Sequence, residues 1–204
     1  MSQDAMREDD GGFAPIALGA NLDGPAGDPA QSLRAALRLL SDRGMLRAVS
    51  RFWRTPAVPA GSGPDFVNAA ALVTMKGRPS AAAAAALLAE LHAIEARLGR
   101  VRHARWAARA VDLDLLGWGD LVLPDAATQA HWRSLPPESQ RTETPSQLIL
   151  PHPRLAERGF VLAPLAEIAS GWRDPVSGRT VAEMLAALPP AALAGMAPLA
   201  AAAG

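Results

Sequence analysis

Asp112 and Asp114, two aspartates separated by one residue, are the side chains of this sequence best suited to do chemistry together. Side chains of a β-strand alternate between its two faces, so a strand over 111–115 would place both carboxylates on one face and Val111, Leu113 and Leu115 on the other. Paired carboxylates can hold Mg²⁺ ions that bridge phosphate oxygens. The alternative is an ordinary half-buried strand whose acids face water.

The residues just before this pair are strongly basic. Between Ala96 and Val111 the chain has five arginines and one histidine and no acid. Guanidinium groups bind phosphate through charge-assisted hydrogen bonds, so a basic loop beside two carboxylates suits a polyphosphate ligand. A basic loop that is merely solvated is the alternative.

Composition excludes several other classes. The 204 residues include 20 basic and 20 acidic ones, and this balance argues against a general nucleic-acid or membrane-surface binder. Cysteine is absent, which excludes disulfides, thiolate zinc sites and a cysteine nucleophile. Residues 1–12 lack the apolar core of a signal peptide, and no uninterrupted apolar run approaches the roughly 20 residues of a membrane span. We therefore expect a cytoplasmic protein with neither nucleic-acid nor membrane partners, and we take it to be a monomer.

The hydrophobic pattern predicts the elements that must position these residues. It indicates strands at 13–18, 46–53, 66–75 and 111–118, a short strand at 121–123, and helices near 28–43, 79–98, 160–168 and 181–188. The order β-α-β-β-α-β favours the α+β class, with a ferredoxin-like antiparallel sheet, helices packed on it and a three-layer α-β-α elaboration.

The same pattern divides the chain into one catalytic domain and three accessory segments. The domain is expected at 13–188, with a flexible extension at 1–12 and an alanine-rich tail at 189–204. The segment 124–147 is rich in proline and polar residues and lacks periodicity, so it is expected to be an inserted surface loop.

Several short motifs follow one another between about residues 13 and 188: Leu18-Gly19-Ala20-Asn21-Leu22, Arg54-Thr55-Pro56, Asp65-Phe66-Val67-Asn68-Ala69-Ala70, Glu95 with Gly99-Arg100-Val101-Arg102, Arg105-Trp106 with Arg109 and Asp112-Leu113-Asp114, and Pro151-His152-Pro153-Arg154 with Glu157-Arg158-Gly159-Phe160. Their joint order resembles that of the hydroxymethyldihydropterin pyrophosphokinases of folate biosynthesis. The segment 124–147 is foreign to the short bacterial members of that family.

The resemblance implies transfer of a diphosphate from ATP to the hydroxymethyl group of 6-hydroxymethyl-7,8-dihydropterin, leaving AMP, with two Mg²⁺ ions. Such a transfer asks a protein mainly for positioning and charge neutralisation. No Walker A motif is present, so metal and arginine must hold the phosphates.

Individual roles follow from the resemblance, position by position. It implies metal binding by Asp112 and Asp114, and catalysis by these two together with Arg100 and Arg109. It assigns ATP to Glu95, Arg100, Arg102, Trp106, Arg109, His152 and Arg158, with the adenine read by backbone groups near Leu115 and Ile149. It assigns the pterin to two stacking rings, Phe66 and Phe160, to the polar side chains Thr55 and Asn68, and to Trp106 and Asp112.

Other interpretations of the same residues stay open. The aspartate pair also fits a two-metal nuclease or nucleotidyl transferase. A non-catalytic ferredoxin-like module that binds nucleotide would leave both aspartates facing solvent. Phe66 and Phe160 are also compatible with ordinary core packing, and His152 with a satisfied loop histidine between two prolines.

Overall fold

One antiparallel sheet organises the chain. The computed structural model describes residues 12–57, 61, 63–74, 77–100 and 110–200. The strands are β1 (Ala14–Ala20), β2 (Leu46–Val49), β3 (Trp53–Thr55), β4 (Phe66–Val73), β5 (Asp112–Leu115) and β6 (Ala197–Pro198). They lie in the order β5-β1-β4-β3-β6, and β2 also pairs with β4. The order β5-β1-β4-β2 confirms the expected ferredoxin-like arrangement.

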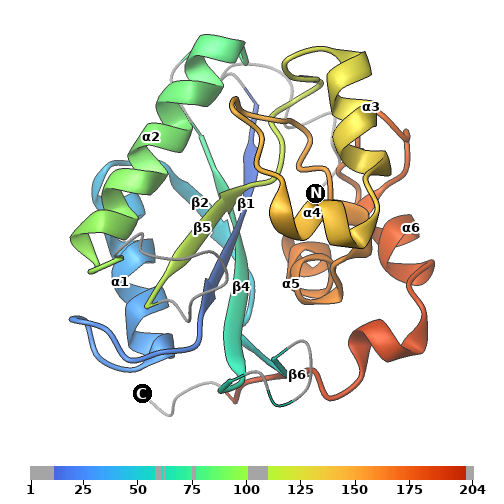
Figure 1. Ribbon diagram of the computed structural model, residues 1–204. Helices are drawn as coiled ribbons and strands as arrows, with labels where there is room; N and C mark the ends of the chain where they lie inside the picture. Colours follow the sequence, from blue (N-terminus) through green and yellow to red (C-terminus); the bar gives the residue numbers. More distant parts are fainter. Residues whose placement is uncertain (1–11, 58–60, 62, 75–76, 101–109, 201–204) are drawn as a thin grey trace.

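Helices cover both faces of this sheet and give three layers (Figure 1). One face carries α1 (Pro29–Asp42) and α2 (Ala81–Arg97), and the other carries α5 (Gly159–Ala169) with α6 (Val181–Ala186). The remaining helical elements are α3 (Ala126–Ser134), α4 (Pro137–Thr142) and the short 3₁₀ turns η2 (Leu155–Glu157) and η3 (Pro190–Leu193).

The alternation of side chains divides the sheet into a core face and a second face. Ile16 and Leu18 of β1 and Leu113 of β5 are buried in the core shared with α1 and α2. The residues between them point the other way, where Ala17 and Ala70 pack against the cluster formed by α5 and α6. Because α5 packs over only part of this second face, the rest of the face has room for polar residues.

The expected single strand at 46–53 is divided in two. β2 pairs Val49 with Ala71, and β3 pairs Trp53 with Asn68, so the register slips by one residue between them. Ser50 lies at this slip, where its hydroxyl accepts a hydrogen bond from the Ala70 amide at 2.9 Å. A side-chain hydroxyl thus replaces part of the strand ladder, as at a β-bulge.

The expectation of an irregular loop at 124–147 is wrong, because α3 and α4 both lie within it. Asp125 begins α3 by accepting a hydrogen bond from the Thr128 amide at 2.8 Å, which is an ordinary N-cap. The many prolines obscured this short helix in the sequence.

The alanine-rich segment from 189, expected as a tail outside the domain, belongs to the fold in the part that the structure describes. Arg54 pairs with Ala197 and Trp53 with Pro198, so β6 extends the sheet beside β3. The Leu199 amide adds a hydrogen bond to the Phe52 carbonyl at 2.7 Å. The folded domain therefore continues beyond residue 188. Within the residues described, no helix has the length and apolar character needed to cross a bilayer.

Candidate active site

The two aspartates lie on the same face of β5, as the sequence predicts. Asp112 and Asp114 are partly exposed, whereas Val111, Leu113 and Leu115 are at most 3% exposed. The side chains of Asp112 and Asp114 retain 25% and 38% of their exposure. Two carboxylates are therefore available side by side at the edge of the sheet, on the face opposite the α1 and α2 core.

A row of paired residues connects the aspartates with β4. Gly19 of β1 pairs with Asp112 on one side and with Asn68 on the other. Directly paired residues of antiparallel strands share a face, so Asn68 and Asp112 flank Gly19 on the same face. A Cβ atom on Gly19 would lie only 2.8 Å from Asn68 Oδ1, which shows how closely the amide covers this glycine.

Asn68 is fixed by a partner from the neighbouring strand. Its Nδ2 donates to Thr55 Oγ1 at 2.7 Å, and both side chains are buried. Phe66 lies two residues before Asn68 and pairs with Thr55, so its ring is on the same face. Thr55, Phe66 and Asn68, which the resemblance assigns to the pterin, are thus brought together at one end of β3 and β4.

The end of α2 delivers Arg100 to the aspartates. Gly99 has a φ of 84°, and the Arg100 amide donates to the Glu95 carbonyl at 3.0 Å, so the helix ends in a Schellman-type turn. This turn brings the Arg100 guanidinium back onto the Glu95 carboxylate, with which it forms an ion pair. Arg100 Nη1 also lies 2.6 Å from Asp112 Oδ1.

Glu95 supports the site from beneath. It is 1% exposed, and its Oε1 accepts a hydrogen bond at 2.7 Å from the amide of Leu113, the residue between the two aspartates. Burial raises the pKa of Glu95 to about 6, and the Leu113 hydrogen bond and the Arg100 charge oppose that rise. Glu95 therefore anchors both Arg100 and β5, and its direct contact with ATP stays a prediction.

Arg158 and Phe160 approach from the start of α5. Arg158 Nη1 lies 3.5 Å from Asp114 Oδ2, and its guanidinium carbon lies 5.7 Å from the centre of the Phe160 ring. Burial lowers the pKa of Arg158, while the negative charge of Asp114 opposes this shift. The Phe160 side chain is exposed, so its ring is available for stacking rather than packed in the core.

His152 is held next to the end of β5. Its backbone amide donates to the Leu116 carbonyl at 2.8 Å, and its Nδ1 accepts from the Arg154 amide at 3.1 Å. Burial lowers the pKa of His152 to about 3, helped by the positive charges of Arg158 and Arg154. The imidazole is therefore neutral at physiological pH, with Nε2 as its remaining polar atom.

The other predicted residues divide into two groups. Leu115 and Ile149 are buried, and the contact of their backbone atoms with adenine stays a prediction. Arg102, Trp106 and Arg109 lie outside the described residues. Two features were not predicted from the sequence. One is the anchoring function of Glu95, and the other is the burial of the polar residue Gln129 in α3.

The donor set suits a hard divalent cation. Asp112 and Asp114 offer oxygen ligands from a partly exposed edge, which is the ligand type that Mg²⁺ prefers. Among the described residues no cluster of three or more His, Asp or Glu side chains could form a complete metal cage. Such a site would take its remaining ligands from phosphate and water, as magnesium sites usually do.

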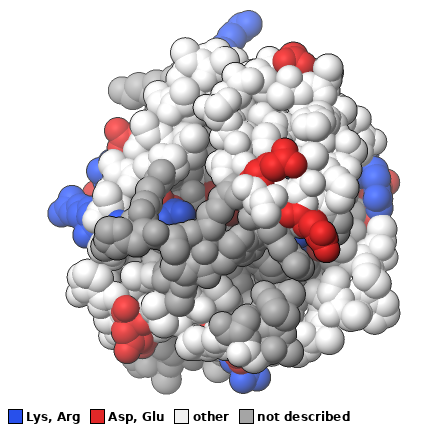
Figure 2. Space-filling view, in the orientation of Figure 1, with Lys and Arg blue, Asp and Glu red and all other residues white. Residues whose placement is uncertain are grey.

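Charges do not form a continuous track on the face seen in Figure 2. The described basic and acidic side chains stand in small separate groups among uncharged residues there. A duplex nucleic acid requires a run of basic contacts, and this view of the described residues shows none.

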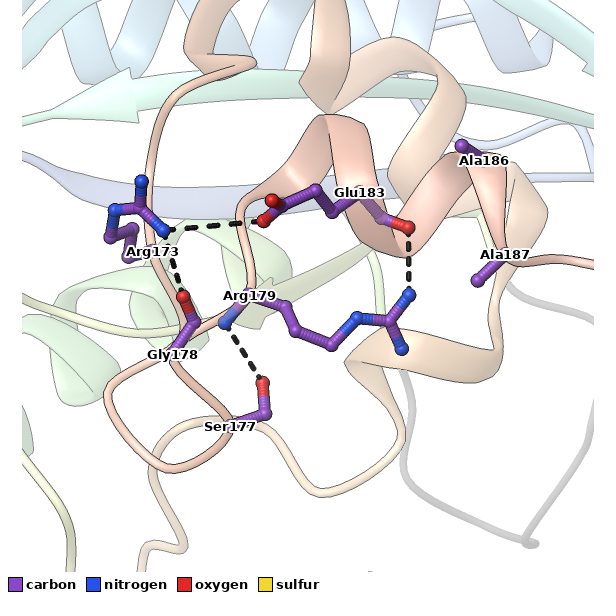
Figure 3. A pocket seen from close by; sticks show the side chains of 7 residues that line it. All are labelled: Arg173, Ser177, Gly178, Arg179, Glu183, Ala186 and Ala187. Carbon is purple, nitrogen blue, oxygen red and sulfur yellow. Dashed lines mark hydrogen bonds and ion pairs between the residues drawn. The ribbon is translucent and has the colours of Figure 1, made fainter.

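A cavity lies elsewhere, beside α6. It has a volume of about 560 Å³ and is lined by Arg173, Ser177, Gly178, Arg179, Glu183, Ala186 and Ala187 (Figure 3). Arg173 donates to the Gly178 carbonyl at 2.9 Å, and Arg179 donates to the Glu183 carbonyl at 2.7 Å. Glu183 itself completes the capping box of α6 with Thr180. The polar groups of this cavity thus serve the local structure.

Comparison with known proteins agrees with this geometry. A family model for 7,8-dihydro-6-hydroxymethylpterin-pyrophosphokinase matches residues 15–170. A relative from Synechocystis sp., named 2-amino-4-hydroxy-6-hydroxymethyldihydropteridine pyrophosphokinase, is 33% identical over 172 residues, or 84% of this chain and 74% of the relative. Relatives of the same name from Methylorubrum extorquens and Pseudomonas aeruginosa are 34% and 36% identical, covering 88% and 85% of this chain and 96% and 90% of their own lengths.

Solved structures support the fold alone. The wild-type HPPK-DHPS protein of Plasmodium falciparum matches with a TM-score of 0.57 at 14% identity, over 85% of this chain and 40% of that one. A triple mutant of the same protein matches with a TM-score of 0.55 over 91% of this chain and 46% of that one. The chain thus spans less than half the length of these two structures. By its family-model match and its relatives, the chain belongs to the 7,8-dihydro-6-hydroxymethylpterin-pyrophosphokinase family.

Proposed function

We propose that this chain transfers a diphosphate group from ATP to the hydroxymethyl group of 6-hydroxymethyl-7,8-dihydropterin, giving AMP and the pterin diphosphate. Family membership supports this pyrophosphokinase activity in folate biosynthesis. The observation that carries the proposal is the row Asp112–Gly19–Asn68 across β5, β1 and β4. It joins a carboxylate pair suited to a metal-bound polyphosphate with polar and aromatic residues suited to a flat heterocycle.

Asp112 and Asp114 would hold magnesium, and we propose two ions. When bound, Mg²⁺ would neutralise phosphate charge and orient the triphosphate. Arg100 and Arg158 each already face one of these carboxylates, so both guanidinium groups lie where phosphate oxygens would be held. The predicted contributions of Arg102, Trp106 and Arg109 would add to them.

The nucleotide would lie along the segment that follows β5. The neutral imidazole of His152 can exchange hydrogen bonds with phosphate or ribose without adding charge. Backbone groups near Leu115 and Ile149 would read the adenine. Glu95 would act on the nucleotide side through Arg100 and the Leu113 amide, both of which its buried carboxylate holds.

The pterin would be bound by stacking and by its polar edge. Phe66 and the exposed ring of Phe160 would supply flat apolar surface. The hydrogen bond to Thr55 uses one N–H of the Asn68 amide and fixes its orientation, so Asn68 Oδ1, which lies over Gly19, would accept from an N–H of the pterin. A heterocycle lacking that N–H would leave a buried acceptor unpaired and bind less well.

The chemistry is a single displacement. The pterin hydroxyl oxygen forms a bond to the β-phosphorus while the bond from that phosphorus to the oxygen bridging the α- and β-phosphates breaks, and AMP leaves with that oxygen. Of the two aspartates, Asp112 is the one that shares a row with Asn68. Asp112 would therefore accept the hydrogen bond of the attacking hydroxyl. Positioning and charge neutralisation supply most of the rate in such transfers.

Product analysis by mass spectrometry tests the proposal. The chain, incubated with ATP, magnesium and 6-hydroxymethyl-7,8-dihydropterin, should form AMP and pterin diphosphate in equal amounts. ADP with a monophosphorylated pterin would contradict it, and so would nucleotide binding without turnover. No feature of the described residues favours a nuclease or a nucleotidyl transferase instead. The monomeric state and the cytoplasmic location remain predictions.

A further inference from the structure

Gln129 is a buried polar residue that belongs to none of the sequence motifs described above. It lies in α3, within the segment 124–147, and its side chain is 0% exposed. Its Nε2 donates a hydrogen bond to the Pro151 carbonyl at 3.1 Å, across 22 residues of sequence. Pro151 immediately precedes His152, so this contact reaches the segment proposed to bind ATP.

The bond from Gln129 completes the fixation of one peptide group. The carbonyl of Pro151 and the amide of His152 belong to the same planar peptide unit. Gln129 holds its oxygen, and the Leu116 carbonyl accepts its N–H at 2.8 Å. This peptide is therefore clamped between α3 and the end of the strand that carries Asp112 and Asp114.

The helix that carries Gln129 is itself anchored on both sides. Before α3, Leu123 and Leu150 exchange backbone hydrogen bonds at 2.8 and 3.2 Å. Near its end, Arg133 Nη1 donates to Asp174 Oδ2 at 2.7 Å, and Asp174 is fully buried. These contacts hold α3 in place, so the hydrogen bond from Gln129 can hold the Pro151–His152 peptide in place as well.

We infer that Gln129 is a positioning residue for the nucleotide side of the active site: by fixing the Pro151–His152 peptide it orients the His152 ring and the Ile149 backbone toward ATP. This inference rests on the proposed ATP-binding function of residues 149–152. It also gives the segment 124–147 a function, since that segment supplies the helix on which Gln129 stands.

Packing alone does not account for a glutamine here. Gln129 Oε1 is buried and has no hydrogen-bond partner among the described residues. An unpaired buried acceptor destabilises a fold, and an apolar side chain of the same length would only exchange this one for an unpaired Pro151 carbonyl, so the glutamine brings the fold little net gain in stability. Gln129→Met retains the shape, removes the unpaired oxygen and deletes the bond to Pro151, which separates a positioning function from a purely structural one.

The test compares the full chain with Gln129→Met and with Gln147→Met, the same substitution at an exposed glutamine of the same segment. Loss of one hydrogen bond should raise the KM for ATP roughly fivefold in Gln129→Met. The KM for the pterin and the midpoint of urea unfolding should stay at wild-type values. In hydrogen exchange, the His152 amide should exchange faster in Gln129→Met, and Gln147→Met should match the wild type in every measurement.

Two results would overturn the inference. One is an unchanged KM for ATP with an unchanged exchange rate at His152. The other is a parallel change in both KM values and in the unfolding midpoint, which would mark Gln129 as structural only. The failure of the proposed function would be seen separately, as a wild-type chain that forms no AMP. Hydrogen exchange does not depend on turnover, so an unchanged exchange rate of the His152 amide in Gln129→Met would overturn the fixation of this peptide even then.

Discussion

Replacement of Glu95 by leucine should destabilise the whole domain, although Glu95 lies beneath the active site rather than in it. The change removes the acceptor for the Leu113 amide and one of the two carboxylates that face Arg100. Breaking a buried ion pair by removing one partner typically costs about 3–5 kcal/mol. That is a large part of the roughly 5–15 kcal/mol by which domains are stable.

Glu95→Gln should separate stability from catalysis. Glutamine retains the volume and an oxygen that can accept from the Leu113 amide, so a charge-assisted hydrogen bond becomes a neutral one at a cost of about 1 kcal/mol. Arg100 then depends on Asp112 alone for its position. If about 1 kcal/mol of transition-state stabilisation is lost with that anchor, kcat falls roughly fivefold while the chain remains folded.

Guanidinium unfolding and steady-state kinetics measure both effects. Glu90→Gln is a matched control, because Glu90 lies on the same helix and forms an exposed ion pair with Arg43 at 3.1 Å. Exposed pairs contribute about 0–1 kcal/mol, so this control should resemble the wild type. The anchoring function of Glu95 is refuted if Glu95→Leu loses no more stability than Glu90→Gln, or if Glu95→Gln retains the full kcat.

Three further substitutions or titrations test other parts of the site. Asp114→Ala should lower kcat by a factor of about a hundred or more, because a metal ligand is lost. The control Asp120→Ala, at an exposed acid six residues later, should retain the wild-type kcat. Equal kcat values for the two variants would exclude a metal function for Asp114. Phe66→Ala should weaken pterin binding roughly tenfold by loss of stacking area and leave ATP binding unchanged by calorimetry, and equal losses for both ligands would contradict stacking. Because burial lowers the pKa of His152 to about 3, below the unfolded value near 6.5, its contribution to stability should be complete above pH 6.5 and be lost as the pH falls from there towards 3. An imidazole NMR titration checks this, and a midpoint for His152 near 6.5 would show that the ring is not buried as described.

Local patterns predicted the elements in which local forces dominate. The alternation at 111–115 predicted both the strand and the shared face of Asp112 and Asp114, because one face of β5 packs in the core. The helices expected near 28–43 and 79–98 are α1, which begins after its N-cap Asp28, and α2, which ends just before Gly99. These features depend on residues a few positions apart, which is the range over which sequence periodicity is informative.

Long-range contacts produced the features that could not be predicted. A buried glutamine is stable at position 129 only because a carbonyl 22 residues later meets its amide, and nothing near Gln129 signals that partner. The two-residue strand β6 has no alternation of its own and forms because β3 offers a free edge. The break after Val49 depends on the Ser50 hydroxyl reaching the Ala70 amide.

Gly19 shows how a correct local rule led to a wrong boundary and overlooked a signal from the site. Glycine usually marks a turn, so the first strand was expected to end at residue 18, yet β1 continues through Ala20. Glycine inside a strand also marks the close approach of another group, and here the Asn68 amide occupies the space where a Cβ would lie. Because Gly19 also pairs with Asp112, any larger residue would displace the amide proposed to read the pterin from the strand next to the carboxylates. The absence of a side chain on β1 is therefore what allows the two halves of the site to face one another across a single strand.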